Sequence, residues 1–303
     1  MTPAEKEKWV ATRDLSPWKR RFRIFWAGWD TRICVGFVTV LLIVALLPSQ
    51  LWPESACRVN IVLRHQLPWI AGGSSAHLLG TDHLGRDILY RLFKSTRLTL
   101  LIAGLATLVS TLAGTIAGLI SGYFRGKADV IVMQLVDTLL AFPTLLLVLA
   151  LVAAVGRTLP GLIVVLGITG WAQYTRVIRS VTLSLSGVEF VEAAKAVGGK
   201  PFYILVRHLL PNIVSPIVML STLGISQVIL TESVISFLGL GPAPPDITWG
   251  GMIGDGRNYL YSAWWSAFFP GLFIFMSVLC FNYLGDIVRE AFDPFTIRHV
   301  SRS

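Results

Sequence analysis

Long apolar runs separated by short polar segments dominate this chain of 303 residues. Each run holds about the 20 apolar residues that a helix needs to cross the hydrocarbon core of a bilayer. The runs are continuously apolar and lack the period of two that is typical of membrane β-barrel strands. We therefore predict an all-α, polytopic membrane protein with six transmembrane helices, at about 33–52, 98–122, 130–155, 161–180, 212–238 and 263–288.

The composition agrees with this pattern. Hydrophobic residues make up 54% of the chain and charged residues only 14%, whereas a soluble domain carries about 25% charged residues. The net charge of +9 would suggest nucleic acid as a partner for a soluble protein. Here the basic residues lie mostly between the apolar runs, so membrane topology explains them and no nucleic-acid partner is expected. The three cysteines indicate no disulfide framework.

The distribution of positive charge predicts the orientation of the chain. A cytoplasmic N-terminus places most of the 26 lysines and arginines on the cytoplasmic side. The first external loop is itself basic and counts against this orientation. The expected layout is an N-terminal tail at 1–32, a membrane domain at 33–288 and a C-terminal tail at 289–303, with both tails cytoplasmic. No cleavable signal peptide is expected, since no small-residue cleavage site accompanies the first run.

The cytoplasmic loop 181–211 reads as two short helices joined by a glycine turn. Residues 188–197 favour a helix, and Gly198 with Gly199 would end it as a C-cap. Pro201 suits the first turn of a second, amphipathic helix that ends before Pro211. Such a helix pair could dock into the groove of a partner protein or lie flat on the lipid surface. These physical arguments alone do not separate the two.

The loop closely resembles the EAA motif of permease subunits in binding-protein-dependent ABC importers. The residues that carry the resemblance are Glu192, Ala193, Ala194, Gly198, His208, Leu210 and Pro211. The resemblance implies that the loop, including Gly199 and Pro201, is the coupling helix that docks onto a cytoplasmic ATPase.

Further segments narrow the resemblance to the C-type permease of dipeptide, oligopeptide and nickel importers. They are LGTDHLGRDILYR at 79–91, DTLLAFP at 137–143, SFLGLG at 236–241 and NYLGDIVREAFDP at 282–294. The N-terminal tail and the external segment 53–78 match poorly. Peptides are therefore the leading class of substrate, followed by nickel chelates and other small polar solutes.

The resemblance also implies partners and a location. The chain would form half of the translocation pathway in a bacterial-type inner membrane, with a second permease subunit, two ATPase subunits and an external solute-binding protein. ATP and magnesium would be bound by the ATPase subunits, with no cofactor or metal in this chain. The sequence agrees that this chain does not bind ATP itself, since neither Gly126-Lys127 nor Gly199-Lys200 fits the phosphate-binding loop of an ATPase.

Two carboxylates inside predicted spans, Asp137 and Glu232, are candidates for the pathway or a gate. Hydrogen bonding within the bundle is the favoured alternative for both. Pro143 is expected to bend the span that holds Asp137. In the external loops, Asp82, Arg86 and Asp87 could form a turn, with Asp82 capping a helix at 84–93, or could face the binding protein. Trp249 and the prolines before it suggest a rigid, semi-buried loop, which could face the binding protein as well.

Other function classes fit the sequence less well. A secondary transporter driven by an ion gradient would be expected to show inverted repeats and a midplane charge cluster. An intramembrane hydrolase needs a histidine near its nucleophile, and all five histidines fall in loops or tails. A purely structural membrane subunit would tolerate mutation of the EAA segment.

Overall fold

A computed structural model describes residues 29–47 and 58–292 of the chain. In those ranges the fold is built of helices, and the only β-structure is one isolated bridge between Thr81 and Asp87. The α-helices are α3 (Trp29–Leu46), α5 (Ile88–Phe124), α6 (Gly126–Ala141), α7 (Thr144–Val155), α8 (Leu159–Leu185), α9 (Glu189–Ala196), α10 (Pro201–Ile204), α11 (Leu210–Phe237), α12 (Trp249–Gly256) and α13 (Trp265–Phe292). The tails predicted at 1–32 and 289–303, and the end of the first predicted span, lie mostly outside the described residues.

Among the described residues, five helices are long and apolar enough to cross a membrane, and the number rises to six if α6 and α7 together form one bent span. This agrees with the six predicted apolar runs. The expected bend at Pro143 is sharp, because α6 and α7 meet at 92°. Phe142, the residue before the proline, is extended, as the proline ring requires of its predecessor.

Two helices begin earlier in the chain than predicted. The helix expected over 98–122 begins at Ile88, and its first turns carry Arg91, Lys94 and Arg97, which interrupt the apolar pattern. The helix expected from 212 continues without a break from the preceding short helices, through a π-helical turn η4 at Leu205–Leu209. Pro211 therefore lies in the first turn of α11 and does not end a separate helix.

Glycines allow α5 and α8 to pack closely. Gly114, Gly118 and Gly122 are four residues apart and form one face of α5. A Cβ atom built on them would lie 2.4 Å from the Cβ of Tyr174, 2.8 Å from that of Ile178 and 2.7 Å from that of Thr182 on α8. The contacting residues are thus four residues apart on both helices. The two backbones approach more closely than a larger side chain on α5 would permit.

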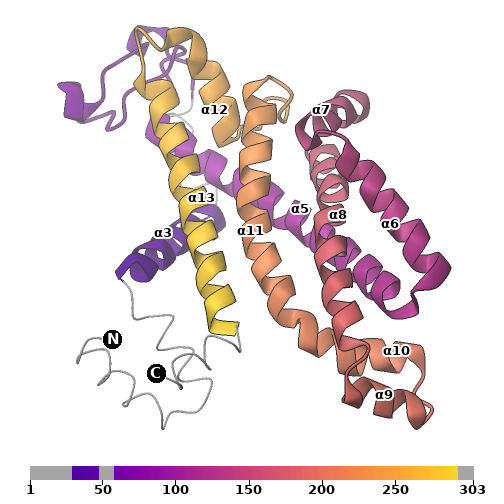
Figure 1. Cartoon of the computed structure of the whole chain (residues 1–303). Coiled ribbons are helices and arrows are strands. Elements are labelled where there is room, and N and C mark those ends of the chain that lie inside the picture. The colour runs from indigo at the N-terminus through magenta and orange to yellow at the C-terminus, as the bar shows by residue number, and fades with distance from the viewer. Residues whose placement is uncertain (1–28, 48–57, 293–303) are drawn as a thin grey trace, which may run out of the picture.

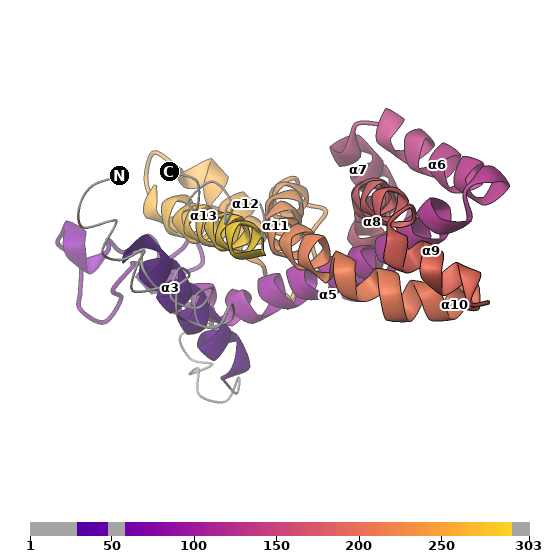
Figure 2. The ribbon, with the colours of Figure 1, turned by 60° about the horizontal axis from the view of Figure 1, so that its bottom comes forward.

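The helices form a broad row, and the short helices lie at the two ends of the long ones (Figure 1). Both views show α3 and α13 at one side, α11 in the middle, and α8 and α6 at the other side (Figures 1 and 2). The α9–α10 segment lies at one end of the long helices, and α12 with the segment 58–87 lies at the opposite end (Figure 1). These two ends hold the candidate sites.

Candidate functional site

The two glycines after α9 form a Schellman C-cap. Gly198 has a left-handed φ of +80°, and its N–H donates to the carbonyl of Lys195 at 3.0 Å. The N–H of Gly199 donates to the carbonyl of Ala194, also at 3.0 Å. These two bonds satisfy carbonyls that the end of a helix leaves without partners. The turn predicted from the glycine pair is therefore present, and it reverses the chain between α9 and α10.

An apolar cluster holds this helical hairpin against the long helices. Val191 on α9, Ile204 on α10 and Leu209 in the π turn are fully buried, and they pack with Ile178 of α8 and Ile213 of α11. The Nζ atom of Lys195 donates to the carbonyl of Ser186 and lies over the ring of Tyr123 on α5. The α9–α10 segment is thus attached to three long helices, so a force on it would be transmitted to them.

The outer surface of the same segment is exposed and partly apolar. Val197 keeps 90% of its surface exposed and Phe202 keeps 77%. Glu192 and Ala193 are exposed too, whereas Ala194 is only partly so, because it packs against the apolar cluster. The ring of His208 lies against Tyr203. Large apolar side chains in such a position are typical of an interaction surface.

The two predicted intramembrane carboxylates have different surroundings. Asp137 on α6 forms an ion pair with Arg176 on α8 at 2.7 Å, and the side chains are 62% and 54% exposed. Glu232 on α11 is fully buried and its Oε1 accepts a hydrogen bond from Ser236 at 2.5 Å. Its Oε2 has no partner among the described residues. Only Asp137 is therefore placed on an accessible face of the chain.

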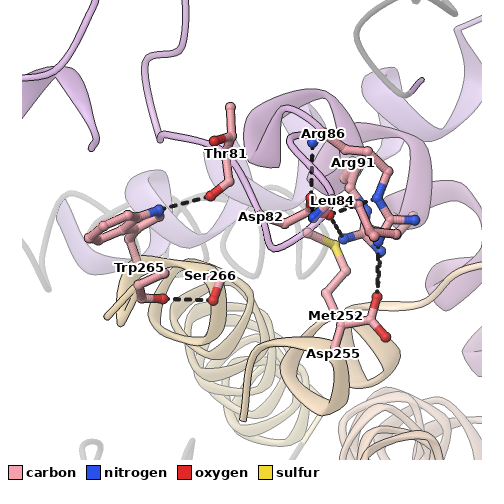
Figure 3. A network of polar contacts seen from close by, with 11 residues as sticks. Thr81, Asp82, Leu84, Arg86, Arg91, Met252, Asp255, Trp265 and Ser266 are labelled. Carbon is pink, nitrogen blue, oxygen red and sulfur yellow. Dashed lines mark hydrogen bonds and ion pairs between the residues drawn. The ribbon is translucent and has the colours of Figure 1, made fainter. Parts of the chain in front are cut away.

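At the opposite end, Asp82 gathers two arginines into a buried network (Figure 3). Its carboxylate accepts from the backbone N–H groups of Leu84 and Arg86 and pairs with the guanidinium groups of Arg86 and Arg91. Arg91 also reaches Asp255 on α12 at 2.7 Å. Burial alone would raise the pKa of Asp82, but the charges of Arg91 and Arg86 and the two N–H donors outweigh it and hold the pKa below its usual value.

The helix cap at this end differs from the expected one. Asp87, and not Asp82, caps α5, since its Oδ1 accepts from the N–H of Tyr90 at 3.1 Å. Its other oxygen lies 2.8 Å from the Nδ1 atom of His77. Asp82 is engaged by the arginines instead, so the network fixes the loop from which the long helix starts.

Trp249 is not a surface residue. It is completely buried, its backbone N–H donates to Thr99 of α5 at 3.3 Å, and its indole N–H donates to the carbonyl of Leu92 at 3.4 Å. On the other side of α12, a Cβ atom on Gly250 would lie 2.4 Å from the Cα of Ser233. Asp82 and Asp87 are buried as well. Of the four residues considered for contact with a binding protein, only Arg86 keeps part of its side chain exposed.

A cavity of about 540 Å³ opens beside this network, between the start of α5, the end of α11 and α12. Its lining residues Lys94, Arg157, Asp255 and Arg257 were not predicted from the sequence. No local pattern signals them, since Asp255 is 164 residues from the arginine that it pairs with. Among the described residues, no group of three or more histidine, cysteine or acidic side chains could hold a metal ion.

Comparison with known proteins identifies relatives over nearly the whole chain. The glutathione transport system permease protein GsiD of Pectobacterium atrosepticum is 38% identical over 96% of this chain and 94% of its own. The dipeptide transport system permease protein DppC of Escherichia coli K12 is 39% identical, over 85% of this chain and 86% of its own. The oligopeptide transport system permease protein OppC of the same organism is 41% identical over 73% of each chain.

A solved structure shares the fold. An inward-facing conformation of the MetNI methionine ABC transporter superposes with a TM-score of 0.57, at 18% identity, over 68% of this chain and 98% of that one. The family model described as "Binding-protein-dependent transport system inner membrane component" matches residues 114–298, which include the whole α9–α10 segment. The chain is therefore a multi-span membrane protein that belongs to the family of inner-membrane permease components of binding-protein-dependent transport systems.

Proposed function

We propose that this chain is one permease subunit of an ATP-driven importer for peptides. It forms half of the pathway, a second permease subunit forms the other half, and an external binding protein delivers the cargo. Two cytoplasmic ATPase subunits bind ATP and magnesium, and this chain has no ATPase site of its own. Peptides are the proposed cargo because relatives at 35–41% identity are named as dipeptide, oligopeptide and glutathione permeases.

One observation carries the coupling part of this proposal. The α9–α10 segment presents exposed apolar side chains on its outer surface while its inner surface is packed against α5, α8 and α11. A segment that binds a partner and is joined rigidly to several spans can link two sites by a free-energy difference, as coupled transport requires. We place this end, and both termini, on the cytoplasmic side and α12 on the external side.

Uptake should depend on ATP and not on an ion gradient. We consider proteoliposomes that contain the assembled transporter, with ATP enclosed and with the binding protein and peptide added outside. Peptide is expected to accumulate inside, and ionophores that collapse the ion gradients should not reduce this uptake. Omission of ATP, or a non-hydrolysable analogue in its place, should abolish accumulation. The alternative function, a secondary transporter, predicts the reverse pattern: uptake without ATP that ionophores abolish.

A cysteine at Ala193 should be captured by the ATPase. Ala193 is exposed on α9, whereas Ala194 is partly buried and is the poorer site for a probe. In membranes that contain the complete transporter, Ala193→Cys with a short bifunctional reagent is expected to yield a permease–ATPase adduct. Tyr261→Cys is the matched control, since Tyr261 is fully exposed in the segment that joins α12 to α13. Adducts with lipid alone at position 193 would instead support a helix that lies on the membrane surface.

A further inference from the structure

The cavity beside α12 has the size and shape of a small-ligand site. Its volume of about 540 Å³ falls within the range of roughly 300–1,000 Å³ that is typical of such sites. Its wall combines the first turns of α5, the last turn of α11, the segment 239–248 and α12. This is a concave site shared by several elements and not a flat docking face.

Positive charge dominates the lining. Five basic residues line the cavity, namely Arg86, Arg91, Lys94, Arg157 and Arg257, against the carboxylates of Asp246 and Asp255. Arg86 and Arg91 are already neutralised, because they share Asp82 and Asp255 in the buried network. The other three basic residues have no ion-pair partner among the described residues.

The two remaining arginines are positioned without being neutralised. The Nε–H of Arg157 donates to the carbonyl of Gly241 at 2.9 Å. Arg257 donates to the carbonyl of Phe237 at 3.4 Å, and its guanidinium lies 5.7 Å from the centre of the Phe237 ring. A carbonyl holds a guanidinium in place but leaves its charge available for an anion. Lys94, which lies on α5, supplies a third such charge.

We propose that this cavity binds the terminal carboxylate of the peptide cargo. The inference rests on the proposed function, since every linear peptide carries a carboxylate at its C-terminus. A guanidinium matches a carboxylate with two parallel N–H···O bonds, and Lys94 adds a point charge. Asp246 offers an acceptor for the ammonium group of the same molecule. The site therefore favours small zwitterions with a free carboxylate over neutral solutes.

The test uses the assembled transporter in lipid nanodiscs, without binding protein, and two probes: dialanine and dialanine amide. Calorimetry or equilibrium dialysis should detect binding of dialanine, with the amide bound about tenfold more weakly or worse. Lys94→Gln should weaken the binding of dialanine several-fold and leave that of the amide unchanged. Arg97→Gln is the matched control, because Arg97 is exposed on the same helix but does not line the cavity.

Three results would overturn the site. They are no binding of dialanine, equal binding of the two probes, or equal effects of Lys94→Gln and Arg97→Gln. A Lys94→Gln transporter that binds dialanine normally but has lost affinity for the binding protein would assign the charges to an acidic protein surface instead. None of these outcomes touches the dependence of uptake on ATP, so failure of the site and failure of the proposed function remain distinguishable.

Discussion

Replacing Gly114 with leucine is expected to prevent α5 and α8 from packing and so to leave little folded protein. A Cβ atom at this position would lie 2.4 Å from the Cβ of Tyr174 and 2.7 Å from the carbonyl oxygen of Trp171. Neither of these atoms is the flexible end of a side chain, so the two helices would have to separate along their length. Overpacking typically costs about 1–3 kcal/mol where side chains can adjust. We expect a larger loss of stability here, because the added side chain would clash with backbone atoms, which cannot move aside.

Gly104→Leu is the matched control for this substitution. Gly104 lies on the same helix, is exposed, and has nothing within 4 Å of an added Cβ atom. Leucine there should leave stability unchanged or raise it, since glycine in a helix costs roughly 0.5–1 kcal/mol relative to alanine. The measurement is the folded fraction after size-exclusion chromatography in detergent, followed by thermal unfolding. Equal folded yield for the two variants would show that the close approach of α5 and α8 is not required.

The α5–α8 contact shows how far the sequence alone can be interpreted. The spacing of four between Gly114, Gly118 and Gly122 predicts a helix face that another helix can approach. It does not say which helix, because the matching residues Tyr174, Ile178 and Thr182 have no unusual composition. Partner choice depends on the geometry of the whole bundle, which no local pattern records.

The α9–α10 turn could be predicted because its determinants are local. A Schellman cap needs only a glycine in the left-handed region and hydrogen bonds within one helical turn, and Gly198 with Gly199 provides both. Which alanine of the EAA motif is exposed could not be predicted. That depends on the cluster around Val191 and Ile204, which joins residues of α5, α8, α9, α10, the π turn and α11.

The other end of the molecule could be predicted less well, for the same reason. Both Asp82 and Asp87 precede a helix in a sequence that suits a cap, and the choice between them is made by Arg91 and by Asp255 of α12. Trp249 lies in a loop according to the sequence, but α5 contacts and buries it through Leu92 and Thr99, which are 157 and 150 residues away along the chain. A helix at 84–93 was one expectation, but its continuity with the span at 98–122 was not predicted, because Arg91, Lys94 and Arg97 interrupt the apolar pattern. Burial accounts for Arg91, and the cavity accounts for Lys94.

Gly198→Val is expected to separate ATP hydrolysis from transport. Nothing lies within 4 Å of a Cβ atom built on Gly198, so valine meets no steric obstacle from neighbouring elements. Its cost comes from the backbone, because φ is +80°. The left-handed conformation costs an ordinary L-residue roughly 1–2 kcal/mol, and a β-branched residue is still less compatible with it. The C-cap should open, so that the carbonyls of Ala194 and Lys195 lose their partners and α9 no longer holds its angle to α10.

The buried cluster should survive this change, because Val191, Ile204 and Leu209 do not depend on the turn for their packing partners in α8 and α11. The transporter should therefore assemble and hydrolyse ATP. Peptide uptake should fall by about tenfold or more, because an α9–α10 turn without its C-cap no longer transmits the movement of the ATPase to the long helices. Gly187→Val is the matched control: Gly187 is exposed in the same loop, without a left-handed φ and with nothing within 4 Å. Uptake and hydrolysis are measured together in proteoliposomes. Wild-type uptake by Gly198→Val would rule out the turn as a coupling element, and an equal loss of uptake in Gly187→Val would attribute the defect to the loop in general.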